Sequence, residues 1–143
     1  MVFLAFDFGT QSWGCAVGDD ITQTATALCG IKAQGGEPCW DEIQQIVKAW
    51  RPDAVVIGYP LKANGERFKL TDQVDIAISA IQKQLGLRVI KADERLTTVE
   101  AKASIYGSKG RKGLVKGNID AESAKCILLN WFEHNNMFND NIV

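Results

Sequence analysis

The sequence predicts a single α/β domain with a mixed β-sheet, and three observations lead to this expectation. The chain has 143 residues, which is close to the commonest size of one domain. Its first part carries three short apolar segments separated by turn residues, a pattern typical of an antiparallel meander. After residue 39, helical patterns alternate with apolar strands, and such alternation places helices against a sheet. We expect a mixed five-stranded sheet with helices on both faces.

Each strand of the expected meander is a short apolar run. The runs cover residues 3–8, 13–17 and 24–32. Gly9, Gly14 and the corner at Gly18 supply the tight turns that connect antiparallel strands. The segment 34–38 contains two glycines and a proline, and we expect it to end the meander.

Two amphipathic helices and two further strands follow. Apolar residues at spacings of three and four predict the helices: Trp40, Ile43, Val47 and Trp50 in the first, and Val74, Ile78, Ile81 and Leu85 in the second. Pro52 ends the first helix and Gly86 caps the second. Strands at 54–59 and 87–92 alternate with these helices. The continuous apolar run of the first of them is typical of a strand covered on both faces.

The last part of the chain predicts further helices around a basic loop. A threonine pair at 97–98 can cap a third helix, and a segment rich in glycine and lysine follows over 107–118. A fourth helix is expected from about residue 120 to residue 134, and the polar segment 135–143 is expected to fray. No internal repeat or linker interrupts the sequence, so residues 1–143 are expected to form one domain.

Composition is typical of a soluble globular domain. Hydrophobic residues make up 46% and charged residues 23% of the chain. No apolar run approaches the roughly 18–20 residues that span a bilayer, and no basic leader precedes Asp7, so we expect a cytoplasmic protein with no membrane partner. The four cysteines form no C-x-x-C pair, and the only histidine, His134, lies in a polar stretch. This pattern favours reduced thiols over a zinc site or a Cys–His nucleophile.

The charge distribution is uneven along the chain. A net charge of −1 argues against a surface that is basic all over. No acidic residue occurs between Glu100 and Asp120, however, and five basic residues fall within 102–116: Lys102, Lys109, Arg111, Lys112 and Lys116. This asymmetry predicts a local phosphate-binding patch. The alternative that composition alone leaves open is a solvated loop.

Three carboxylates lie where the expected elements meet. Asp7 is on the first strand, Glu94 just follows the fifth, and Asp120 begins the last helix. Carboxylates that converge at one edge of a sheet can hold Mg²⁺, which prefers oxygen ligands and which activates water against a phosphodiester. Each also has a purely structural interpretation. Asp7 could bond the turn at Gly9, Glu94 could pair with Arg95, and Asp120 could cap its helix.

Four short motifs occur in a fixed order along the chain. They are Asp7-Phe8-Gly9-Thr10 with Gly14 and Ala16-Val17, then Gly58-Tyr59-Pro60-Leu61, then Asp93-Glu94-Arg95-Leu96-Thr97-Thr98 with Glu100-Ala101, and finally Lys116-Gly117 with Ile119-Asp120. Together they resemble the YqgF family, whose members are described as nucleases of precursor 16S ribosomal RNA or as Holliday junction resolvases. A single Asp-x-Gly-Thr is a weak signal, whereas four ordered motifs from Phe3 to about Trp131 are specific.

The resemblance implies a ribonuclease H-like fold in which Asp7, Glu94 and Asp120 bind one or two Mg²⁺ or Mn²⁺ ions and catalyse phosphodiester hydrolysis. It further implies trimming of the 5′ end of precursor 16S ribosomal RNA, and hence a part in ribosome biogenesis. We expect nucleic acid as the partner, and a monomer or weak homodimer. Phosphates flanking the cut are expected to contact basic side chains of the third motif and the loop: Arg95, Lys109, Arg111, Lys112 and Lys116.

The sequence departs from the family at Gln11-Ser12, where a basic pair is common. Lys62, Arg67 or the basic loop could then carry more of the phosphate binding. Trp13 could stack on a base, the alternative being core packing. Three other functions stay open: cleavage of Holliday junctions, a non-catalytic nucleic-acid-binding or ribosome-assembly role, and ATP binding of the kind found in actin-like proteins, which share an Asp-x-Gly-Thr hairpin.

Overall fold

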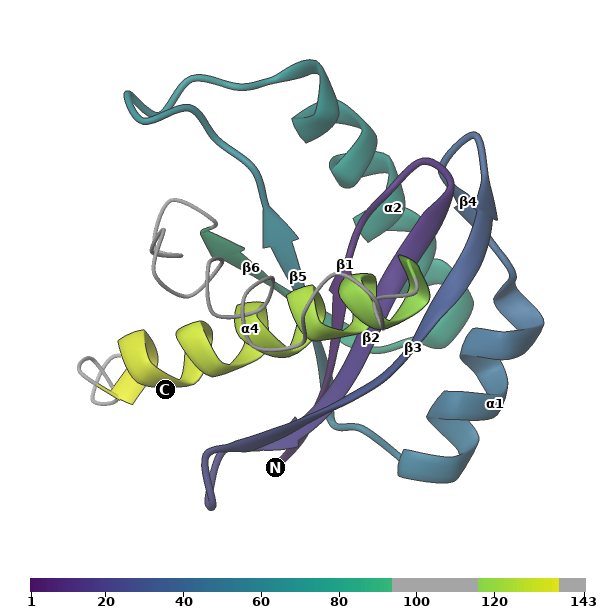
Figure 1. Ribbon diagram of the computed structural model, residues 1–143, viewed down its shortest axis with the longest axis vertical. Coiled ribbons are helices and arrows are strands. Elements are labelled where there is room, and N and C mark those ends of the chain that lie inside the picture. Colours follow the sequence, from purple (N-terminus) through teal and green to yellow (C-terminus); the bar gives the residue numbers. More distant parts are fainter. Residues whose placement is uncertain (94–115, 137–143) are drawn as a thin grey trace.

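A six-stranded sheet forms the centre of the computed structural model, which describes residues 1–93 and 116–136 (Figure 1). The strands in these ranges are β1 (Val2–Asp7), β2 (Ser12–Asp19), β3 (Thr24–Gln34), β4 (Glu37–Pro38), β5 (Ala54–Tyr59) and β6 (Arg88–Asp93). The helices in them are α1 (Trp40–Trp50), α2 (Lys69–Leu85) and α4 (Lys116–Asn136). This order agrees with the predicted meander and the alternation after it. The helix expected after residues 97–98 lies outside the described ranges.

The strand order brings the ends of three strands to one edge of the sheet. The order is β4-β3-β2-β1-β5-β6. β1, β2 and β3 pair antiparallel, whereas β5 runs parallel to both β1 and β6. The carboxyl ends of β1, β5 and β6 therefore lie at the same edge, at Asp7, Tyr59 and Asp93. Two of the four motifs begin at this edge, and a third spans it.

The sixth strand corrects the expectation of five. β4 pairs with the end of β3, where Ala33 lies opposite Pro38. Gly35 and Gly36 form the two-residue turn between them, with φ angles of 60° and 88°. A Gly-Gly pair is among the sequences that such hairpin turns favour, because both turn residues need a positive φ. The expectation of five strands is wrong because a proline, although excluded from central strands, is tolerated on an edge strand.

Helices cover both faces of the sheet, as predicted (Figure 1). One core lies under α1 and α2 and includes Phe6, Trp13, Ile43, Val74 and Ile81. The other lies under α4 and includes Phe3, Ala5, Val56, Ala124 and Leu128. Successive residues of β1 alternate between these two cores, so the alternation places Asp7 on the α4 side. No helix in the described ranges is both long enough and apolar enough to cross a membrane.

The last helix differs from its expected bounds. α4 begins at Lys116, before the expected start at Asp120, and continues to Asn136. Gly117 and Asn118 are poor helix formers, yet α4 packs across β1, β2 and β3, and packing overrides weak intrinsic preferences. Asp120 therefore lies within the helix, and the interpretation of Asp120 as an N-cap is wrong.

Candidate active site

Asp7 and Asp120 line one pocket at the sheet edge where β1 ends. The pocket has a volume of about 230 Å³. Its walls are the two aspartates and the turn between β1 and β2: Asp7, Phe8, Gly9, Thr10, Gln11, Ser12 and Asp120. Two of the three carboxylates predicted to bind metal are thus brought together from opposite ends of the chain.

Gly14 allows α4 to approach the sheet closely beside this pocket. It lies opposite Asp7 in the register between β1 and β2. A Cβ atom on residue 14 would lie 1.8 Å from the backbone oxygen of Asp120, far inside contact distance. Any side chain at this position would push α4 away from β2. Gly14 therefore sets the position of Asp120 relative to Asp7.

Hydrogen bonds fix the turn that forms the pocket wall to the hairpin of β3 and β4. The amide of Ala33 donates to the carbonyl oxygen of Gln11 at 2.9 Å, and the amide of Gly36 donates to that of Thr10 at 2.9 Å. A Cβ atom on Gly9 would lie 2.3 Å from a backbone oxygen three residues later, so a side chain there would force the turn open. The wall beside the aspartates is therefore held in one conformation.

One carboxylate oxygen of Asp120, Oδ2, is buried and has no hydrogen-bond partner among the residues that the structure describes. An ionised carboxylate has only acceptors, and a buried group left unpaired costs about 1–3 kcal/mol, or more when it is charged. Mg²⁺ and Mn²⁺ bind oxygen ligands of this kind. Two carboxylates beside the backbone and hydroxyl oxygens of the turn therefore fit a hard divalent cation.

Glu94, the third predicted carboxylate, lies outside the described residues. It directly follows Asp93, the last residue of β6, and β6 ends at the same edge as β1. Within residues 1–93 and 116–136, no three His, Cys, Asp or Glu residues form a group that could hold a metal. The structure thus brings Asp7 and Asp120 together, and the place of Glu94 beside them stays a prediction.

The predicted phosphate-binding residues fall mostly beyond the described ranges. Lys116 is the first residue of α4, the helix that carries Asp120. The other four lie outside the residues that the structure describes: Arg95, Lys109, Arg111 and Lys112. The basic patch therefore stays a prediction, with one member on the helix that reaches the pocket.

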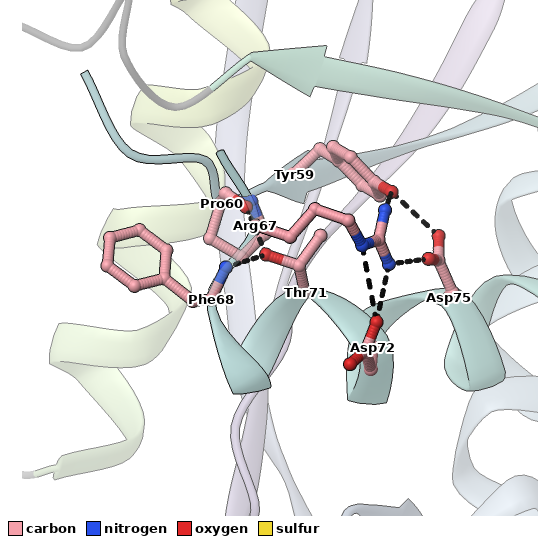
Figure 2. A network of polar contacts seen from close by, with 7 residues as sticks. All are labelled: Tyr59, Pro60, Arg67, Phe68, Thr71, Asp72 and Asp75. Carbon is pink, nitrogen blue, oxygen red and sulfur yellow. Dashed lines mark hydrogen bonds and ion pairs between the residues drawn. The ribbon is translucent and has the colours of Figure 1, made fainter. Parts of the chain in front are cut away.

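Arg67, just before α2, is held in a polar network with two aspartates of that helix (Figure 2). Its guanidinium donates to Asp72 Oδ1 at 2.7 Å, to the hydroxyl of Tyr59 at 2.8 Å, and to Asp75. The hydrogen bonds to Asp72 and Asp75 raise the pKa of Arg67. Because two carboxylates surround its single positive charge, the structure does not support Arg67 as a replacement for the basic pair of the family.

The same network anchors the chain that leaves β5 (Figure 2). The hydroxyl of Tyr59 donates to Asp75 Oδ1 at 2.9 Å, and Lys91 Nζ lies 4.6 Å from the centre of the Tyr59 ring. The hydroxyl of Thr71 donates to the carbonyl oxygen of Pro60 at 2.5 Å. The sequence signal for this network is the pair of aspartates one helical turn apart after Arg67, which belong to none of the four motifs. The network fixes the strand that lies between β1 and β6 at the site's edge.

Two other side chains considered for nucleic-acid contacts have different surroundings. Lys62 is half exposed and forms a loose ion pair with Glu66 at 3.9 Å, so it remains open to solvent. Trp13 is fully buried, with its ring 5.4 Å from Phe6 and 5.9 Å from Trp40. The core-packing interpretation of Trp13 is confirmed, and the stacking interpretation is wrong because no face of the ring is exposed.

Comparison with solved structures identifies the fold. The chain is similar to RuvC of Thermus thermophilus in complex with a Holliday junction substrate, with a TM-score of 0.58 and 19% identity, over 94% of this chain and 95% of that one. A second RuvC structure from Thermus thermophilus gives a TM-score of 0.56 and 17% identity, over 96% and 97% of the two chains. The fold is therefore ribonuclease H-like, as predicted from the motifs.

Comparison of sequences identifies the family. The family model described as "RuvX: Holliday junction resolvase" matches residues 1–134. A protein named as a pre-16S rRNA nuclease from Actinobacillus pleuropneumoniae serotype 5b is 48% identical over 130 residues, which are 91% of this chain and 95% of the relative. A protein of the same name from Haemophilus influenzae (strain PittGG) is 47% identical over 131 residues, or 92% and 94% of the two chains. The chain belongs to the RuvX family of nucleases, and the resemblance drawn from the four motifs is confirmed.

Proposed function

We propose that this protein is a metal-dependent endonuclease that trims the 5′ end of precursor 16S ribosomal RNA, and that it thereby acts in ribosome biogenesis in the cytoplasm. The observation that carries the proposal is that Asp7 and Asp120 line one pocket at the sheet edge. β6 ends at this edge, directly before Glu94. The proposal assigns metal binding to Asp7, Glu94 and Asp120.

The three carboxylates would hold one or two Mg²⁺ or Mn²⁺ ions. Such an ion, when bound, lowers the pKa of a coordinated water and stabilises negative charge on phosphate oxygens. Asp7 and Asp120 supply negative charge without a neighbouring histidine. The only histidine, His134, is hydrogen-bonded to the backbone of Asn130, several helical turns from Asp120. The site therefore depends on carboxylates and on the rigid turn that positions them.

Substrate phosphates would be held by residues around the pocket. Gln11 and Ser12 leave the turn that forms one wall of the pocket without a basic side chain. We assign the flanking contacts to the basic side chains of the third motif and the loop: Arg95, Lys109, Arg111, Lys112 and Lys116. Contacts of this kind position a strand without reading its sequence. We therefore expect the structure of the RNA, rather than its local sequence, to define the cut.

The relatives favour RNA over a DNA junction. Proteins 43% and 48% identical to this chain are named for precursor 16S ribosomal RNA, whereas the neighbour solved with a Holliday junction is 19% identical. The description of the family model names junction resolution, which makes it the second candidate. Resolution requires two symmetric cuts and hence a dimer with two sites. We propose a monomer or a weak homodimer, as the RNA-cleaving role requires a single site.

A cleavage panel tests the proposal. Wild type, Asp7→Asn and Asp120→Asn are incubated with an RNA that carries a single-stranded 5′ extension and with a four-way DNA junction, each with Mg²⁺ or with a chelator. We expect Mg²⁺-dependent RNA cleavage that falls by about 100-fold or more in both variants, because several kcal/mol of transition-state stabilisation are lost. Asp41→Asn is the matched control, since Asp41 is exposed in the first turn of α1.

The outcomes separate the candidate functions. Undiminished cleavage by Asp7→Asn would contradict the metal site. Preferential cleavage of the junction would favour the resolvase. RNA binding by a wild-type protein that cuts neither substrate would favour the non-catalytic assembly role.

A further inference from the structure

A second hollow lies beside the Asp7–Asp120 pocket, between α2 and the turns at the sheet edge. We call it the aromatic groove and define it by five of its lining residues: Phe8, Pro38, Trp40, Ile76 and Ala77. Its volume is about 100 Å³. Phe8 lines both this groove and the Asp7–Asp120 pocket, so the two hollows share one wall residue at the sheet edge.

The aromatic walls of the groove are held rigidly. The fully buried ring of Trp13 packs against both of them, 5.6 Å from the Phe8 ring and 5.9 Å from the Trp40 ring. Nε1 of Trp13 donates to the carbonyl oxygen of Gly36 at 3.2 Å, and Nε1 of Trp40 donates to Glu37 Oε1 at 2.9 Å. Because the indole nitrogens are already bonded, the walls keep a fixed shape. A fixed aromatic surface loses little conformational freedom when a flat ring packs against it.

The α2 wall of the groove is apolar and faces solvent. Ile76 is 71% exposed, although it lies next to the buried Ala77 on the helix. Gln73, one turn earlier, is also exposed and contributes an amide to the rim. The exposed side chain of Ile76 extends the apolar surface that a ligand in the hollow can contact.

The groove has the size and charge for a base rather than for a phosphate or a helix. Its volume of about 100 Å³ corresponds to roughly three water molecules, far less than the 300–1,000 Å³ of a typical cofactor site. The carboxylate of Glu37 at the rim repels phosphate, whereas it and Gln73 can hydrogen-bond the edge of a base. Successive residues of a β-strand point to opposite faces of the sheet, so Asp7 and the next residue, Phe8, face opposite sides. A nucleic-acid strand bound at Asp7 therefore reaches the groove by crossing the turn at Phe8.

We propose that the aromatic groove binds one unpaired base of the substrate strand, next to the phosphate held at the Asp7–Asp120 pocket. The inference rests on the proposed nuclease function, because it takes the occupant of the pocket to be a nucleic-acid strand. It adds a base-binding site made by Phe8, Trp40 and Ile76. The site discriminates single-stranded from paired substrate, since a paired base cannot leave its stack without an energetic cost.

The experiment compares two probes of equal length and charge: a short oligouridylate and an abasic ribose-phosphate oligomer. Dissociation constants are measured by fluorescence anisotropy in a chelator, so that no cleavage occurs. We expect wild type to prefer the oligouridylate by about 5- to 150-fold, the range for one base stacked on a protein ring. Ile76→Ser should reduce this preference about fivefold, and its affinity for the abasic oligomer should not change.

Two further variants complete the design. Ile21→Ser is the matched control, because Ile21 is 83% exposed in the turn between β2 and β3, at the opposite edge of the sheet. Trp40→Leu should lower the base preference as Ile76→Ser does, with circular dichroism to confirm that the protein is folded. Asp7→Asn should keep the full preference in chelator, so loss of cleavage and loss of base binding are measured separately.

Three results would overturn the inference. The first is an equal affinity of wild type for the two probes. The second is an unchanged base preference in Ile76→Ser and Trp40→Leu. The third is that Ile76→Ser abolishes self-association in sedimentation without altering base preference, which would assign the groove to a second copy of the chain.

Discussion

Gly14 and Asp120 lie in backbone contact: a Cβ atom on residue 14 would be 1.8 Å from the carbonyl oxygen of Asp120. The contact joins β2 to α4 directly beside Asp7, the strand partner of Gly14. The position of the Asp120 carboxylate therefore depends on the absence of a side chain on the neighbouring strand. A glycine that performs no chemistry determines whether the two acidic groups share a pocket.

Replacing this glycine should impair catalysis more than folding. We expect Gly14→Ala to lower kcat/KM for RNA cleavage by about 100-fold, because a displacement near 1 Å of a catalytic group costs that much. Gly86→Asn is the control: residue 86 has a φ of 65°, no atom lies within 4 Å of its Cβ position, and asparagine tolerates this conformation at a helix end. Wild-type activity in Gly14→Ala would show that the contact does not position Asp120.

Arg67 and the basic loop should differ in their effect on RNA binding. We expect Arg67→Gln to lower the melting temperature and to leave the salt dependence of binding unchanged, because Asp72 and Asp75 already compensate its charge. The double variant Lys112→Gln and Lys116→Gln should instead reduce the slope of the logarithm of the RNA-binding constant against the logarithm of the salt concentration by about 1–2. Binding titrations at several salt concentrations check both. A reduced slope in Arg67→Gln would place Arg67 on the substrate.

The Arg67 network should also weaken in acid. Burial raises the pKa of Asp75, but the hydrogen bonds from Arg67 and Tyr59 outweigh burial and lower the pKa. A carboxyl with a lowered pKa stabilises the folded protein above its unfolded pKa of about 3.9, and this contribution is lost as pH falls through the folded value. Urea unfolding should therefore separate wild type from Asp75→Asn at neutral pH, and the difference should disappear as the pH falls through the lowered folded pKa of Asp75. A difference that persists in acid would contradict this assignment.

Cys29 should be the reactive thiol of the sheet. Cys15 and Cys29 are cross-strand partners in β2 and β3. A hydrogen bond from Cys15 lowers the pKa of Cys29 to about 7 against the opposing effect of burial. Because the thiolate is the nucleophile, alkylation of Cys29 by iodoacetamide, followed by mass spectrometry, should rise with pH around that value. Cys15→Ala should move the midpoint upward; an unmoved midpoint would exclude the hydrogen bond as the cause.

The elements of the fold could be predicted where a local pattern determines them. Ile43, Val74 and Ile81 are buried where the helical spacing expects apolar contacts. The parallel alignment of β5 with β1 and β6 follows from helices between the strands, and this alignment brings the starts of the first and third motifs to one edge. The sequence did not predict β4, because Pro38 argues against a strand although Gly35 and Gly36 favour a hairpin turn.

For the candidate site, the sequence predicts which types of residue take part but not how they are arranged in space. The motifs identify Asp7 and Asp120 as acidic residues of one family pattern, but their shared pocket depends on α4 crossing β2 at Gly14, a contact that no local spacing encodes. In the same way, the sequence offers Arg67 as an available cation, whereas the structure surrounds it with two carboxylates on α2. The aromatic groove combines Phe8, directly after β1, with residues of β4, α1 and α2, and it exists only after these elements have packed.

Binding of Mn²⁺, which occupies the same oxygen sites as Mg²⁺, tests the central claim most directly. Calorimetric titrations compare wild type, Asp7→Asn, Asp120→Asn and the control Asp41→Asn. We expect wild type and Asp41→Asn to bind with equal affinity, and both pocket variants to bind at least about 10- to 100-fold more weakly. Equal affinity in all four proteins would contradict a metal site shared by Asp7 and Asp120.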